Sequence, residues 1–373
     1  MRHHGEQREA GRVGHLPRLP GGPSPKGTTS LTANFALTEF YEVPQEFIGH
    51  SSTVASVVAL LLSSLDTGGS HTTTAPAQPA AAHQGLLARR PLTSFFVMAY
   101  AFTWIVWSPW VLGKDGAGLL PIHISQTMSG YLNATAILCG PTVAALIMTG
   151  TIEGRAGVRS LLGRLVLWRV GIQWYLFALL GVPLIMVVGT MVYSGDLPKL
   201  GALGGLLFLP NYLLSFLLVV VLGGPLFEEI GWRGFALPRM EPLHGPLLAS
   251  VILGLLWALW HLPEFLVPSW AASSGGGSIT SIILFALIDI TFAVVITWVF
   301  NNTRASVLIA ILLHTSIDAF SETLGAIFPA KAVASGFPLL IGFGVVAVVI
   351  IVLTRGRLSY ERLVEAQSAP RVR

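Results

Sequence analysis

From residue 91 to residue 354 the chain is a series of long apolar runs separated by short polar segments. Charged residues make up 11% of its 373 residues and hydrophobic residues 53%, whereas a soluble domain carries about 25% charged residues. So little charge cannot cover a globule of this size in water. The sequence therefore predicts an all-α, polytopic membrane bundle, because a transmembrane β-barrel would show short alternating segments instead.

Eight apolar segments come close to the ~20 residues that an α-helix needs to cross a bilayer. They are residues 92–112, 130–150, 173–193, 205–224, 246–263, 280–300, 305–321 and 336–354. Arginines occupy alternate connecting segments, whereas the intervening ones hold little positive charge beyond Lys114, Lys199 and Lys331. By the positive-inside rule both termini are predicted to be cytoplasmic, which supports an even number of helices.

The parts of the chain outside the apolar runs differ in composition. Residues 1–90 are rich in small and polar residues and lack periodicity, so they are predicted to be a mostly disordered cytoplasmic tail. Residues 91–355 form the predicted membrane domain, and residues 356–373 a short basic cytoplasmic tail. The single cysteine, Cys139, excludes an intramolecular disulfide framework. The small net charge of +4 gives no reason to expect a nucleic-acid partner.

The first candidate site motif is the pair Glu228 and Glu229 followed by Arg233. On a helix Glu229 and Arg233 share a face and can pair, while Glu228 is turned about 100° away and stays free for chemistry. The preceding Gly223–Pro225 segment should break the helix, and a broken helix in a membrane often marks a site. An interfacial amphipathic helix with solvated charges is the alternative interpretation.

Two further motifs place histidines in apolar runs. Trp257 and His261 are four residues apart, as are His314 and Asp318, so each pair shares a helix face. Asp318 can fix the ring tautomer of His314 and raise its basicity, and Trp257 can wall off the site. His261 could instead be interfacial. Asp289, a carboxylate inside the sixth segment, could line the same cavity, although a structural role is favoured.

These three motifs, in this order on successive membrane helices, resemble the CPBP (CAAX-processing and bacteriocin-processing, or Abi) family of intramembrane proteases, and its bacterial branch in particular. The resemblance covers roughly residues 91–355 and implies that Glu228 activates water for peptide hydrolysis, with both histidines beside it. The residues it assigns to the site are Glu228, His261, His314 and Asp318 as catalytic, and Glu229, Arg233 and Trp257 as supporting. It also implies a bacterial cell membrane as the location.

The sequence departs from the family pattern at two positions. Trp257 stands where phenylalanine is more usual, and Asp318 where asparagine is common. An ionised aspartate cannot donate a hydrogen bond, so orienting His314 suits Asp318 better than binding an oxyanion.

Two mechanisms remain open at this stage. Glu228, His261 and His314 could hold one divalent metal ion such as zinc, with water in the fourth position. Alternatively, Glu228 acts as general base without a metal and the histidines stabilise the tetrahedral intermediate. A zincin of the soluble type is excluded because no His-Glu-x-x-His occurs.

The predicted function is that of an intramembrane, CAAX-prenyl-protease-like endopeptidase, which cuts a peptide bond near the cytoplasmic membrane face. Its partners would be the lipid bilayer and a peptide or protein substrate, whereas the oligomeric state is not indicated. A non-catalytic immunity or adaptor protein on the same fold is the main alternative. A transporter is disfavoured because the sequence shows no internal repeat.

Overall fold

The computed structural model describes residues 85–203, 205 and 208–368, and every regular element in these residues is a helix. The all-α prediction is confirmed for this part of the chain. Nearly all of the predicted tail, residues 1–90, lies outside the described residues. Its last residues include the short helix α3 (Leu86–Arg89).

Seven helical segments are long and apolar enough to cross a membrane, and an eighth results if one bent pair is a single span. The seven are α4 (Pro91–Val111), α5–η1–α6–η2 (Gln126–Val166), α7–η3–α8 (Ile172–Ser194), α12–η7 (Pro246–Leu266), α14 (Ile279–Asn302), α15 (Val307–Ile327) and α17 (Phe337–Thr354). The bent pair is α9 (Phe208–Leu222) with α10 (Pro225–Gly231), η6 (Trp232–Ala236) and α11 (Leu237–His244). The predicted bundle of about eight membrane helices is thus confirmed.

Two parts of the helical frame differ from the prediction. The second span is longer than expected because α6 (Val143–Gly163) continues through a kink at Gly154 into the arginine-rich segment that follows. The predicted C-terminal tail contains the helix α18 (Tyr360–Ser368), which buries Leu363. A single buried leucine is too weak a signal to distinguish a docked helix from a solvated tail.

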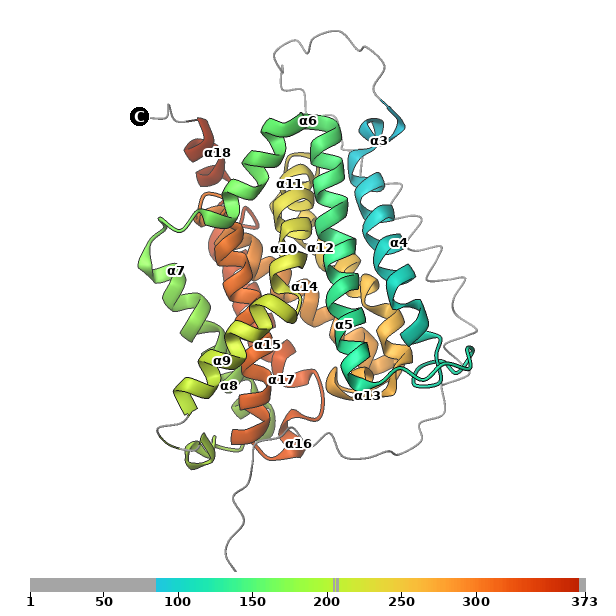
Figure 1. Cartoon of the computed structure of the whole chain (residues 1–373). Helices are drawn as coiled ribbons and strands as arrows, with labels where there is room; N and C mark the ends of the chain where they lie inside the picture. The colour runs from blue at the N-terminus through green and yellow to red at the C-terminus, as the bar shows by residue number, and fades with distance from the viewer. Residues whose placement is uncertain (1–84, 204, 206–207, 369–373) are drawn as a thin grey trace, which may run out of the picture. The chain divides into compact units, whose positions relative to one another are not determined.

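The helices around the centre of the bundle pack closely. The helix α12 (Pro246–Trp260) packs along α14, α14 along α17, and α17 along α8 (Val182–Ser194), while α15 contacts α9 and α10 (Figure 1). The C-terminal half of the bent pair is anchored to η1 (Leu138–Thr142) at its start, because the Thr142 hydroxyl donates to the Phe227 carbonyl in α10. A Cβ at Gly231 would lie 2.8 Å from the Pro141 carbonyl oxygen, so only glycine permits this close approach.

The two ends of the bundle carry different charges. The ends of α3, α6, α11 and α18 lie together at the top of Figure 1, and this end carries the arginine-rich segments. The short helices α13 (Pro268–Ser273) and α16 (Ala330–Val333) lie at the opposite end. This separation of charge agrees with the predicted alternation of arginine-rich and arginine-poor connecting segments. The cytoplasmic location of the termini stays a prediction.

Candidate active site

The two adjacent glutamates face different surroundings, as their spacing predicts. The helix breaks before α10, where Gly224 has φ 111° and the two halves of the bent pair meet at 44°. Arg233 Nη1 donates to Glu229 Oε1 at 2.8 Å, and both side chains are fully buried. Glu228 Oε2 accepts hydrogen bonds from the indole N–H groups of Trp257 at 2.7 Å and Trp232 at 3.3 Å. A solvated amphipathic helix is therefore the wrong interpretation of this motif.

His314 lies between two carboxylates. Its Nδ1 is 3.0 Å from Glu229 Oε1, and its Nε2 is 3.6 Å from Asp318 Oδ2. Because an ionised carboxylate only accepts, Nδ1 carries a proton and donates it to Glu229. The sequence predicts Asp318 as the orienting partner, but Glu229 is closer and joins His314 to Arg233 through one oxygen.

Trp257 connects the first motif to the histidines. Its ring lies 4.7 Å from the Arg233 guanidinium carbon and 4.9 Å, centroid to centroid, from the ring of His314. Its carbonyl oxygen is 3.1 Å from His261 Nδ1, which must therefore carry a proton. The indole thus holds Glu228 while the backbone of the same residue fixes the tautomer of His261.

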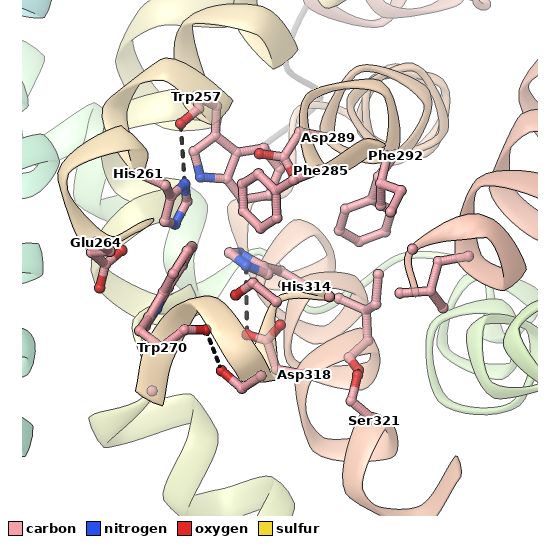
Figure 2. Close-up of a pocket in the computed structure, with 18 of the residues that line it drawn as sticks. Trp257, His261, Glu264, Trp270, Phe285, Asp289, Phe292, His314, Asp318 and Ser321 are labelled. Carbon is pink, nitrogen blue, oxygen red and sulfur yellow. Dashed lines mark hydrogen bonds and ion pairs between the residues drawn. The ribbon is translucent and has the colours of Figure 1, made fainter. Parts of the chain in front are cut away.

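The four residues predicted to be catalytic open onto one cavity of about 430 Å³, and Trp257 also lines it. Glu228, His261, His314 and Asp318 all line it, and Figure 2 shows the two histidines facing the same space. Glu229 and Arg233 do not line the cavity but lie behind its wall. This placement separates groups that can touch a substrate from groups that hold them in position.

Two further carboxylates line this cavity, and sequence reasoning missed one of them, Glu264. Glu264 is 1% exposed and Asp289 is 7% exposed, and each has one oxygen without a hydrogen-bond partner among the described residues. Both line the cavity, whereas a structural role was expected for Asp289 (Figure 2). The signal for Glu264 was available, since it is a lone acid three residues after His261 in an apolar segment.

The arrangement does not fit the three-ligand metal set that the sequence allows. Among the described residues, no three histidine, cysteine or acidic side chains lie close enough together to hold an ion. No step of the mechanism below is therefore assigned to a metal.

Replacing Gly224 with alanine is expected to lower cleavage at least tenfold by displacing Glu228. An alanine Cβ would lie 2.6 Å from Glu228 Oε1, and φ 111° disfavours any residue with a Cβ. The measurement is initial cleavage rate per folded protein. Gly344→Ala is the control, since its Cβ would meet nothing within 4 Å, and equal activity of the two variants would contradict the prediction.

Comparisons with known proteins agree with this geometry. A family model described as "Type II CAAX prenyl endopeptidase Rce1-like" matches residues 210–320, which contain all three motifs. The chain is also 24% identical over 260 residues to "CAAX prenyl protease 2" of Methanococcus maripaludis, an alignment covering 68% of this chain and 92% of that relative. The bacterial branch stays a prediction. Together with the helical membrane frame and the three motifs around one cavity, these matches support a member of the CPBP family of intramembrane proteases.

Proposed function

We propose that the protein hydrolyses peptide bonds within the membrane with water activated by Glu228. The observation that carries this proposal is the position of Glu228, a buried carboxylate in the wall of a cavity shared with His261 and His314. An acid costs several kcal/mol inside a membrane protein and is retained there mainly for function. The indole N–H groups of Trp257 and Trp232 donate to Oε2 of Glu228, whereas its Oε1 has no hydrogen-bond partner among the described residues.

Glu228 acts as general base and then as general acid. Its carboxylate takes a proton from water as the water oxygen attacks the peptide carbonyl carbon, and the carbonyl oxygen becomes the oxyanion. When the C–N bond breaks, Glu228 returns the proton to the leaving amine. The indole hydrogen bonds from Trp257 and Trp232 hold the Glu228 carboxylate in one orientation in the cavity wall.

The two histidines perform different tasks because their partners differ. The bond to the Trp257 carbonyl leaves Nε2 of His261 with a lone pair, which can orient the attacking water. Glu229 and Asp318 together balance the charges of Arg233 and a protonated His314. A protonated His314 presents Nε2–H to the cavity and stabilises the oxyanion, and Asp318 favours that charged form.

Cleavage of membrane-presented peptides tests this function. Purified protein in detergent is incubated with a peptide library, wild type beside Glu228→Gln, each with and without a chelator. We expect wild-type cleavage that is lost in the variant and unchanged by the chelator. Cleavage that stops on chelation and returns with zinc would overturn the metal-free mechanism, and a folded wild type that cuts nothing would favour the non-catalytic alternative.

His314→Ala should reduce cleavage by about 100-fold or more, the usual loss when one oxyanion donor is removed. The variant should still be expressed, although Glu229 loses one of its two partners. The control is His123→Ala, because the side chain of His123 is 70% exposed and is absent from the cavity lining. Activity of His314→Ala within threefold of wild type would contradict its role.

A further inference from the structure

We infer that the cavity recognises a basic side chain of the substrate, an arginine or a lysine close to the bond that is cut, through the carboxyls of Glu264 and Asp289. The inference rests on the proposed function and adds a class of substrate to it. Neither acid takes part in the hydrolytic steps described above. Both line the cavity, so both can touch a bound peptide.

The two carboxyls are buried in the cavity wall without a partner. Glu264 is 1% exposed and Asp289 is 7% exposed, and Oε1 of the first and Oδ2 of the second have no hydrogen-bond partner among the described residues. Neither acid belongs to an ion pair in this part of the chain. Buried polar groups are nearly always paired, so an unpaired acid inside a membrane bundle points to a ligand or a functional role.

The cavity wall holds more acid than base. Among the described residues, four acids and no arginine or lysine line it, and the four are Glu228, Glu264, Asp289 and Asp318. Asp318 lies 3.6 Å from the Nε2 of His314, whereas the other three have no cation within ion-pair distance. A buried carboxyl is costly as an anion unless a cation is close, and a substrate cation would supply that charge. The excess of acid therefore favours a positively charged ligand.

The position of Asp289 puts it close to the reacting groups. Phe285, Asp289 and Phe292 are spaced four and three residues apart, so they share one face of α14, and all three line the cavity. The Phe285 ring lies 5.3 Å, centroid to centroid, from the His261 ring, and the Phe292 ring lies 6.2 Å from the His314 ring. Asp289 is thus one helical turn from a residue that contacts each histidine (Figure 2).

Glu264 lies in an aromatic part of the same wall. It follows His261 by three residues in η7 (Leu262–Leu266), and the ring of Trp270 stacks on that of His261 with the centroids 5.9 Å apart. Trp270 also meets Phe285 edge-on at 5.6 Å. Aromatic faces attract guanidinium and ammonium groups, so rings beside an acid suit both the aliphatic stem and the charged end of arginine or lysine.

Matched peptides test the inference. A library peptide that the wild type cleaves is acetylated at its N-terminus, and each position near the cut is replaced in turn by arginine or by citrulline. Citrulline keeps the shape of arginine without its charge. At one position at least, arginine should raise kcat/KM tenfold or more over citrulline. Equal values for the two peptides at every position would overturn the inference.

Asp289→Asn and Glu264→Gln test whether the two acids cause the preference. Each substitution removes a charge and keeps an acceptor oxygen, so each should reduce the arginine-to-citrulline ratio of kcat/KM at least threefold, and the double variant should bring it close to one. Glu241→Gln is the matched control, since Glu241 is equally buried but absent from the cavity lining, and it should keep the wild-type ratio. An unchanged ratio in the double variant, with a lowered thermal unfolding midpoint, would mean that the acids are structural.

Binding separates this inference from the proposed function. The Glu228→Gln protein should bind the peptides without cutting them, and titration calorimetry in detergent compares its affinities for the arginine and citrulline forms. Tighter binding of the arginine form, lost when both acids are also replaced, would support the cation site even if the wild type cleaved no peptide. Cleavage by the wild type with no preference for arginine in either measurement would leave the proposed function standing and contradict the inference.

Discussion

Glu228→Gln is expected to lower the peptide cleavage rate by at least about 100-fold while the protein stays folded. An amide cannot take a proton from water at neutral pH, so the general base is lost. The amide oxygen of glutamine can still accept the hydrogen bond from Trp257, which the carboxylate accepts at 2.7 Å. The measurement is the initial rate with a cleavable peptide, alongside the thermal unfolding midpoint in the same detergent.

Glu241→Gln provides a matched control for this substitution. Glu241 is 1% exposed, is absent from the cavity lining, and accepts a hydrogen bond from Asn301 at 2.7 Å that a glutamine oxygen can also accept. The Glu241→Gln variant should therefore cleave the peptide at a rate close to that of the wild type. Full activity of Glu228→Gln would show that another group activates the water, and equal loss in both variants would point to a general effect of replacing a buried acid.

Contacts within one helix could be predicted from the sequence. The pairing of Glu229 with Arg233 follows from a spacing of four residues, and the break before α10 follows from Gly223–Pro225. Helix lengths and the alternation of arginines likewise follow from local composition, because the bilayer sets the length of each span.

Contacts between helices could not be predicted in this way. The contact of Glu229 with His314 joins residues 85 positions apart and depends on how α10 packs against α15. The cavity is also nonlocal, because it is lined by residues before α17 and after α13 that no periodicity relates.

The second large expected effect is on the stability of the protein. Arg233, which lies behind the cavity wall, neutralises the buried carboxylate of Glu229. Arg233→Met is expected to lower the free energy of unfolding by about 3–5 kcal/mol, the usual cost of removing one partner of a buried ion pair. Methionine preserves much of the side-chain volume, so the loss reports mainly the charge left on Glu229. The measurement is denaturant unfolding in mixed micelles.

The control and a second variant separate charge from packing. Arg239→Met removes an arginine whose ion pair with Glu153 is partly exposed, so it should cost about 1 kcal/mol or less. Adding Glu229→Gln to Arg233→Met removes the unpaired charge and should recover at least half of the lost stability. If the double variant is only as stable as Arg233→Met, the loss comes from the contact of Arg233 with the Trp257 ring and not from the unpaired charge. Cleavage should stay low even in a restabilised double variant, because His314 then lacks the carboxylate that holds its Nδ1 proton.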